Sequence, residues 1–142
     1  MRLLITGVSD DGRSCVVEDR TPSEVPFEGN GIIVVQAAKT SSSPPPPRPR
    51  GQGHHINVEA IPGTAGWNFI KFPAQTTTGV HNTDSLDFNV ILEGSVDLIL
   101  DDGPHRLGPG DAAVINGVDH GWQTGDSACR MSVVVIATAP LD

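Results

Sequence analysis

The sequence is short of basic residues and of long apolar runs. Lys and Arg together number 9 against 17 Asp and Glu, which gives a formal net charge of −8. Nucleic acids and anionic membrane surfaces both attract basic patches, so this balance argues against both as partners. No apolar run is long enough to span a bilayer, and the first residues have too short an apolar core for a signal peptide. We therefore expect a cytoplasmic protein.

Cysteine pairs and helical periodicity are also missing. The two cysteines, Cys15 and Cys129, are far apart in the sequence and match no metal-binding spacing. They fit a reducing compartment better than a disulfide scaffold. No stretch sustains a helical period long enough to compete with strands. The 142 residues suit one domain with a real core.

Short apolar runs separated by Gly-containing turns fill the chain instead, and this pattern predicts β-strands and hairpins. The strands that we expect are Leu3–Thr6, Cys15–Glu18, Gly31–Ala38, His55–Ile61, Gly66–Phe72, Asp87–Glu93, Val96–Leu100, Ala112–Ile115 and Met131–Thr138. Because Gly31–Ala38 is apolar throughout, we expect it to be buried on both faces. Residues 40–53 contain four consecutive prolines, which cannot join a sheet ladder, and predict an exposed or mobile loop.

The stretch from Gly79 to Trp122 contains the most informative residue spacings in the sequence. It contains His81-x-Thr83, then Asp87 after three residues and Gly94 after six more. Further on it contains Gly110-Asp111, an apolar run, and Gly117, His120 and Thr124.

These spacings resemble the two motifs of the cupin superfamily, in which His-x-His, Glu and Gly are followed by Gly-Asp, a strand, Pro-x-Gly, His and Asn. Thr83 stands where a cupin has its second His, and Asp87 where it has Glu. The resemblance runs from about Trp67 to Ala137. It implies an all-β fold, a cupin jelly-roll barrel or sandwich with extra N-terminal strands. Residues 1–53 would then pack on a barrel formed by residues 54–142, as one structural domain.

Three side chains within this frame are candidates for the chemistry: His81, Asp87 and His120. Two histidines and one carboxylate are a ligand set for a divalent transition metal, Zn, Fe, Mn or Ni, with positions left open for substrate. Without a metal, one histidine could move a proton while Asp87, by hydrogen bonding, fixes its tautomer and stabilises its charged form. Both interpretations stay open from the sequence.

Candidate substrate-binding residues are Trp67, Phe69, Lys71, Thr83, Asn89 and Trp122. Alternation in Gly66–Phe72 puts Trp67, Phe69 and Lys71 on one face and Asn68, Ile70 and Phe72 on the other, and it leaves open which set faces the pocket. Asp87 and Asn89 share one face of their strand, which is typical of a pocket wall, and Phe88, Val90 and Leu92 share the other. This wholly apolar opposite row should pack against another layer, either the N-terminal strands or a second subunit, and we expect a homodimer.

The variant His-x-Thr-Asp-x-x-Asp-Phe is similar to a branch of single-domain cupins, several of which accompany enzymes of small-molecule or polyketide biosynthesis. The resemblance therefore implies an enzyme that acts on a small organic substrate, with dehydratase-like or isomerase-like proton transfer by His81 or His120. A metal-dependent dioxygenase or decarboxylase is one alternative, and a cupin that binds a small ligand without turnover is another.

Overall fold

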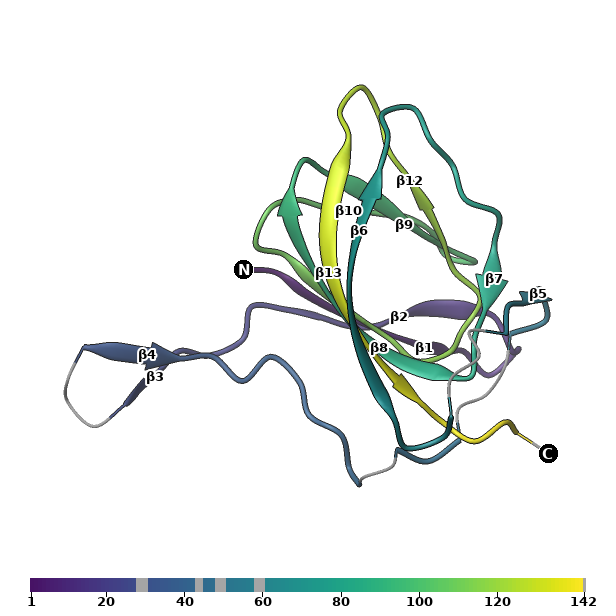
Figure 1. The fold of residues 1–142 in the computed structure, drawn as a ribbon, viewed down its shortest axis with the longest axis horizontal. Helices are drawn as coiled ribbons and strands as arrows, with labels where there is room; N and C mark the ends of the chain where they lie inside the picture. The colour runs from purple at the N-terminus through teal and green to yellow at the C-terminus, as the bar shows by residue number, and fades with distance from the viewer. Residues whose placement is uncertain (28–30, 43–44, 48–50, 58–60, 142) are drawn as a thin grey trace.

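The protein is described by a computed structural model, which covers residues 1–27, 31–42, 45–47, 51–57 and 61–141. Over these residues the chain forms strands and turns (Figure 1), which confirms the all-β prediction. The same described residues contain no helix that is long and apolar enough to cross a membrane.

Two sheets build the body of the molecule (Figure 1). The larger sheet has six strands in the order β2-β1-β11-β8-β13-β6. Their bounds are Ser14–Arg20, Leu3–Val8, Ala112–Ile115, Ser85–Glu93, Cys129–Ala137 and Ala65–Phe72. The smaller sheet has three strands in the order β10-β9-β12, with bounds Gly103–Leu107, Val96–Leu100 and Gly121–Gln123. Strand β1 pairs in parallel with β11, so the N-terminal strand is part of the larger sheet.

The main core lies between the two sheets, because alternate residues of each strand point toward the other sheet. Its fully buried members include Leu4 and Ile91 from the larger sheet and Val96 and Leu98 from the smaller one. A second cluster lies on the outer face of the larger sheet, where Phe88, Ala37 and Ala38 pack against buried residues that include Leu3 and Val114. The apolar outer row is therefore covered in part by the chain itself.

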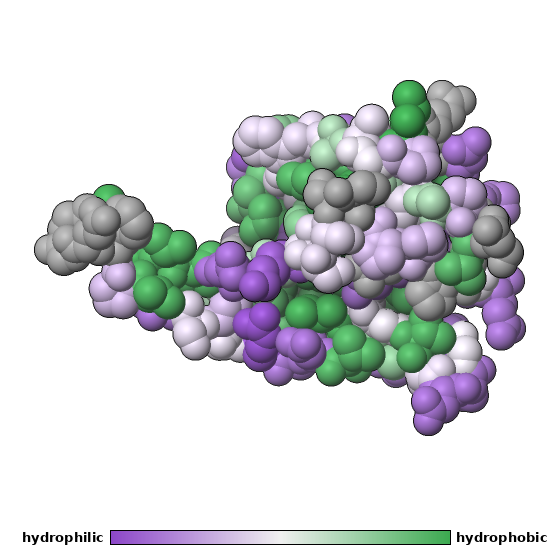
Figure 2. Space-filling model, turned by 90° about the horizontal axis from the view of Figure 1, so that it is seen from below, coloured by the Kyte–Doolittle hydropathy of each residue, from purple (hydrophilic) through white to green (hydrophobic). Residues whose placement is uncertain are grey.

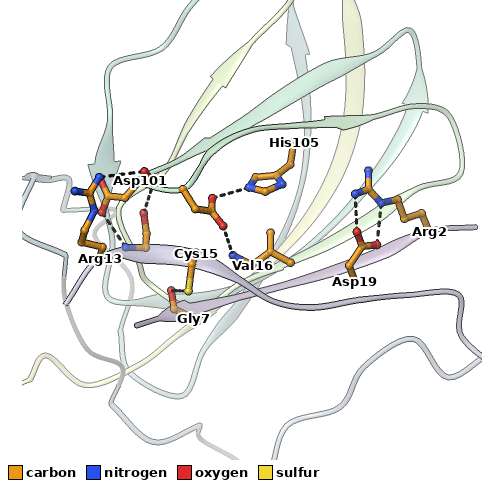
Figure 3. Close-up of polar contacts among 10 residues, drawn as sticks. Arg2, Gly7, Arg13, Cys15, Val16, Asp19, Asp101 and His105 are labelled. Atoms are coloured by element: carbon orange, nitrogen blue, oxygen red, sulfur yellow. Dashed lines mark hydrogen bonds and ion pairs between the residues drawn. The ribbon is translucent and has the colours of Figure 1, made fainter. Parts of the chain in front are cut away.

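Polar contacts fasten the N-terminal hairpin β1–β2 to the turn between β9 and β10 (Figure 3). The carboxylates of Asp101 and Asp102 accept hydrogen bonds from the backbone N–H groups of Ser14 (2.8 Å) and Val16 (2.9 Å). His105 contacts the same Asp102 carboxylate at 2.6 Å. Backbone donors at the edge strand β2 are thus satisfied by side chains of the other sheet.

The apolar segment Gly31–Ala38 corrects our prediction of a doubly buried strand. Within this segment only Ile32–Val34 (β4) is a strand, and its one partner among the described strands is Val25–Phe27 (β3). This short hairpin projects from the body (Figure 1), and the side chains of β4 are 45–52% exposed. An apolar run predicts a strand but does not say which surface covers it, and here the described chain leaves it uncovered.

The other strand predictions are confirmed within a few residues at the ends, with one exception. Among the described residues, the strand expected at His55–Ile61 is seen only as His54–His55 (β5), which pairs in parallel with His81–Asn82 (β7). Residues 58–60 of that prediction lie outside the described residues, as do residues 43–44 and 48–50 of the proline-rich segment.

The described end of the proline-rich segment is anchored rather than loose. Asp119 is buried, and its carboxylate accepts hydrogen bonds from the backbone N–H groups of Gln52 (2.7 Å) and Gly53 (2.9 Å). The side-chain amide of Asn82 donates a further bond to the same carboxylate at 2.7 Å. A Cβ added at Gly53 would lie 2.8 Å from Asp119 Oδ1, so glycine permits this close approach. The anchor ties this segment to β7 and to the residue that precedes His120.

Candidate active site

A cavity of about 620 Å³ opens between the two sheets. His81, Thr83, Asp87, Asn89, His120 and Trp122 all line it, so the cavity brings together six of the nine side chains expected from the sequence. The other lining residues are Thr64, Ala65, Gly66, Asn68, Ile70, Phe72, Thr78, Met131, Val133 and Val135. The polar side chains come mainly from β7, β8 and the approach to β12, and the apolar ones mainly from β6 and β13.

The two histidines form a pair that the backbone holds. The N–H of His81 donates to the carbonyl of His120, and the N–H of His120 donates to the carbonyl of His81, both at 2.9 Å. The ring centroids are 4.4 Å apart, and the ring planes are tilted by 52°. The relative position of the two rings is therefore set by main-chain hydrogen bonds between neighbouring segments.

Each ring is also fixed in one tautomer. His81 Nδ1 lies 2.9 Å from the carbonyl oxygen of Gly79, and His120 Nδ1 lies 2.9 Å from that of Val118. A carbonyl only accepts, so Nδ1 carries the proton in both rings and the neutral ring presents Nε2 as an acceptor. Over the described residues, no protein hydrogen bond to either Nε2 is formed. This corrects our prediction that Asp87 fixes the tautomer, because backbone carbonyls do so.

Asp87 is a buried carboxylate, and hydrogen bonds replace only part of the hydration that it loses. Its Oδ1 is inaccessible to solvent and has no hydrogen-bond partner among the described residues. Desolvation by burial raises the pKa of Asp87 from 3.8 to about 6, and a hydrogen bond from Ser85, which favours the charged form, offsets only part of that rise. The Ser85 hydroxyl also contacts the Thr83 hydroxyl at 2.8 Å. A carboxylate with a pKa near neutrality can both take and return a proton at physiological pH.

His120 is neutral at physiological pH. Burial lowers its pKa from 6.5 to about 4, although the hydrogen bond to the carbonyl of Val118 works in the opposite direction. The neighbouring His81 lowers it further, because two adjacent positive rings repel each other. Asp87 therefore has the pKa closer to physiological pH, whereas His120 is a neutral hydrogen-bond acceptor.

These two shifts predict opposite effects of pH on stability. For Asp87 the folded-state pKa, about 6, lies above the ordinary 3.8, so the folded state binds the proton more tightly and stability falls as pH rises through that window. For His120 the folded-state pKa, about 4, lies below the ordinary 6.5, so stability rises as pH increases between them. The two contributions largely cancel between pH 4 and 6.

We expect Asp87→Asn to remove the first contribution and leave the second. The free energy of unfolding of the variant, relative to the wild type, should then rise by on the order of 3 kcal/mol between pH 4 and 6. Urea denaturation of both proteins at several pH values across this range measures the difference. Parallel stability profiles for the two proteins would contradict a buried, raised Asp87.

The described donors supply two imidazoles but not a complete set of metal ligands. Across the described part of the chain, no three His, Cys, Asp or Glu side chains come together closely enough to hold a metal ion. His81 and His120 stand side by side with free Nε2 atoms, but Asp87 does not complete a three-ligand set with them. The site therefore offers a pair of imidazole acceptors and a separate carboxylate within one cavity.

Three expected substrate-binding residues lie outside this cavity. Trp67 and Phe69 are 70% and 61% exposed and pack against each other on the outer face of β6, and Lys71 has the same parity. The cavity is lined instead by Asn68, Ile70 and Phe72. Register explains the correction. Asn68 and Ile70 stand opposite Val133 and Met131 on β13, and cross-strand neighbours share a face of the sheet.

The sequence also did not allow us to predict most of the apolar residues that line the cavity. Met131, Val133 and Val135 line the cavity from β13, and their spacing of two was visible in the sequence. The segment reads as apolar at almost every position, so alternation alone could not say which set faces inward. Ser85, the hydrogen-bond partner of Asp87, gave no signal because it occupies an unspecified position within the expected motif.

Residues 68–136 match the family model described as Cupin domain, Cupin_2. The chain is a cupin-domain protein. This confirms the expected family, and the two-sheet architecture agrees with the expected barrel or sandwich.

Several fungal proteins resemble this cupin chain in sequence. It is 38% identical over 86 residues to the phomopsin biosynthesis cluster protein C' of Diaporthe leptostromiformis, covering 58% of this chain and 46% of that protein. It is 28% identical over 123 residues to the cupin-domain-containing oxidoreductase virC of Hypocrea virens, covering 83% of this chain and 56% of that protein. The chain thus spans about half the length of these curated relatives.

Solved structures resemble the cupin domain over about half of the chain. The polyketide cyclase RemF from Streptomyces resistomycificus shows 27% identity and a TM-score of 0.48, covering 55% of this chain and 62% of that chain. The DMSP lyase DddQ from Ruegeria pomeroyi DSS-3 shows 26% identity and a TM-score of 0.49, covering 54% of this chain and 42% of that chain.

Proposed function

We propose that this cupin is an enzyme that transfers a proton on a small organic metabolite, in lyase-type or isomerase-type chemistry, with Asp87 as the proton-transfer residue. The observation that carries the proposal is the buried Oδ1 of Asp87, which lacks a hydrogen-bond partner among the described residues, on a side chain that lines the cavity. Burying a carboxylate without full compensation costs stability, and such groups concentrate at functional sites.

The geometry suggests separate roles for Asp87 and for the two histidines. At pH 7 a carboxyl group with a pKa of about 6 is mostly ionised, so Asp87 can take a proton from a carbon next to a carbonyl group. The Nε2 atoms of His81 and His120 accept hydrogen bonds from a substrate hydroxyl and fix its position. Asp87 then returns the proton either to a neighbouring carbon, which isomerises the substrate, or to a departing hydroxyl group, which leaves as water.

The sequence relatives support a biosynthetic setting. Two proteins of Diaporthe leptostromiformis, 38% identical over 86 and 85 residues, are named for a phomopsin biosynthesis cluster. An Aspergillus oryzae protein, 34% identical over 64 residues, is named for an oryzines biosynthesis cluster. We infer that this chain acts on a metabolite of such a pathway.

Solvent-deuterium exchange tests the proposed chemistry. The protein is incubated in D2O with a panel of uncharged cyclic ketones and β-hydroxyketones, and NMR follows the loss of the proton next to the carbonyl. We expect faster exchange or loss of water for members of the panel. Binding of the same compounds without exchange would contradict proton transfer and favour a cupin that only binds its ligand.

Redox chemistry at a bound transition metal is the second candidate, because one relative is named an oxidoreductase and two imidazole Nε2 atoms are free. Exhaustive chelation separates the two candidates. We expect the exchange rate to survive dialysis against EDTA, with metal content measured in parallel by mass spectrometry. Loss of activity that one added metal restores would establish the metal enzyme instead.

We also propose that the protein forms a homodimer through the hairpin β3–β4. A two-stranded hairpin is marginal in water by itself, and Val25, Ile32 and Ile33 on this one are at least half exposed. Figure 2 shows apolar side chains along the projecting arm and on the adjacent face of the body. A second copy would cover both surfaces.

Light scattering at micromolar concentration tests the dimer. We expect about twice the mass of the 14.9 kDa chain for the wild type and a monomer for Ile33→Asp, because a charge on the arm would be buried in the interface. Val17→Asp is the matched control: Val17 is similarly exposed, at 54%, but lies on β2 away from the arm. A wild-type monomer would contradict the proposal.

A further inference from the structure

The polar end of the cavity offers hydrogen-bond acceptors. The rings of His81 and His120 both use Nδ1–H on backbone carbonyls, which leaves Nε2 as an acceptor in each neutral ring. The ionised carboxylate of Asp87, a side chain that lines the cavity, is a third acceptor, and its Oδ1 has no partner among the described residues. A ligand that satisfies these three groups must therefore bring O–H or N–H donors.

The hydroxyls and amide nearby are engaged inside the protein. Thr83 and Ser85 share a hydrogen bond of 2.8 Å. The Asn89 amide points to the backbone carbonyls of Asp87 and Ala113, at 3.4 Å each. These groups are thus not free to solvate a negatively charged group of a ligand, and among the other lining residues the amide of Asn68 remains as a neutral donor.

Cations are missing from the cavity lining within the described residues, where neither Lys nor Arg appears. The basic side chains of the two lining strands are directed elsewhere. Lys71 is exposed and has the outward parity of Trp67 and Phe69. Arg130 is paired with Glu93 at 2.6 Å on the surface. A phosphate or carboxylate in the cavity would meet Asp87 without a compensating charge, which is unfavourable in a desolvated site.

Most of the remaining wall is apolar and partly aromatic, with Thr64, Asn68 and Thr78 as its polar members. Phe72 and Trp122 lie with ring centroids 6.3 Å apart, tilted by 32°. Ile70, Met131 and Val133 continue this surface from β6 and β13. A volume of about 620 Å³ is within the range that small-molecule sites occupy. Such walls favour a ring system over a flexible polar chain.

We propose that the cavity selects an uncharged, largely apolar ring compound that presents a hydroxyl group, phenolic, enolic or alcoholic, to His81, His120 and Asp87. This inference deepens the proposed function, because it assigns a substrate class to the same site. Anionic compounds of the same shape are rejected by the carboxylate and by the absence of a cation. Compounds that lack the hydroxyl donor leave the three acceptors unsatisfied.

Equilibrium dialysis with three matched compounds tests the inference at pH 7.5. The probes are 2-naphthol, 2-methoxynaphthalene and 2-naphthoate, which share the ring system and differ in donor and charge. We expect 2-naphthol to bind best, the methoxy compound several-fold more weakly, and the carboxylate at least about tenfold more weakly. Binding of 2-naphthoate equal to that of 2-naphthol, or no binding of 2-naphthol, would overturn the inference.

Two neighbouring substitutions show whether 2-naphthol occupies the cavity. Ile70 lines the cavity and is 37% exposed, so Ile70→Trp fills the space without burying a strained core residue. Phe69→Trp places the same side chain on the opposite face of β6. We expect the first variant to lose 2-naphthol binding and the second to keep it. Equal binding by both variants would place the probe elsewhere and overturn the inference.

Asp87→Asn tests the origin of the charge selection. Without the carboxylate, the difference in affinity between 2-naphthol and 2-naphthoate should shrink several-fold, and an unchanged difference would contradict the role of Asp87. None of these measurements needs turnover. Binding of 2-naphthol together with no exchange on any ketone or β-hydroxyketone of the panel would end the proposed function alone, whereas proton transfer on an anionic compound only would end this inference alone.

Discussion

Replacing Asp87 by asparagine should lower the rate of solvent-deuterium exchange by at least about a hundredfold, the usual share of a positioned acid or base. Asparagine keeps the size of the side chain and removes its ability to take a proton. In the wild type, kcat/KM should rise with pH through about pH 6 and then level off, because the base must be ionised. The residual activity of the variant should lack that rise.

Two further variants test whether the loss of rate is specific to the carboxylate of Asp87. Asp87→Glu retains a carboxylate one methylene longer, and it should recover part of the rate together with a rise in the pH profile. Asp97→Asn is the matched control, because Asp97 is a partly exposed carboxylate on β9 that pairs with Arg106 at 3.2 Å. Its rate should equal that of the wild type. A fully active Asp87→Asn protein would end the assignment of Asp87 as the base.

Replacing Asp119 by alanine should destabilise the fold by about 4 kcal/mol. The substitution removes a buried carboxylate that accepts from Gln52, Gly53 and Asn82, and it leaves these donors without their acceptor. Hydrogen bonds to charged groups contribute more than neutral ones, and unsatisfied buried donors add a desolvation penalty. Urea denaturation followed by circular dichroism measures the loss.

Graded substitutions separate this effect from a general loss of charge. Asp119→Asn keeps one acceptor and should lose about half as much stability as the alanine variant. Asp97→Asn again serves as control and should change the free energy of unfolding by less than about 0.5 kcal/mol. If Asp119→Ala loses less than about 1 kcal/mol, water replaces the carboxylate and the proposed anchor does not hold the segment.

Local spacing was sufficient to predict the fold and to predict that three polar side chains lie in one cavity. The Gly-containing turns and strand lengths between Asp87 and Ile115 predicted strands that the structure confirms, because turn chemistry and period-two patterning act over a few residues. The same motif frame predicted that His81, Asp87 and His120 line one cavity. Their individual roles were not predictable, because the tautomers depend on the carbonyls of Gly79 and Val118.

The features that depend on long-range register could not be predicted. The inward face of β6 is set by its pairing with β13, and Ile70 stands opposite Met131 across 61 positions of sequence. Asp119 was missed for the same reason, since its partners Gln52 and Gly53 are 67 and 66 residues away. The exposure of β4 depends on which surface lies above it, which no local pattern specifies.

In this cupin, the positions of the two histidine rings and the shape of the cavity are determined by different parts of the structure. The positions of the two rings are encoded in backbone pairing, whereas the size and shape of the cavity are encoded in side chains such as Ile70, Met131 and Val133. A combinatorial library at those three positions can therefore change which ring system fits while the rings stay where the backbone holds them. The shape of the cavity can thus be changed at positions that do not take part in the backbone pairing of the two histidines.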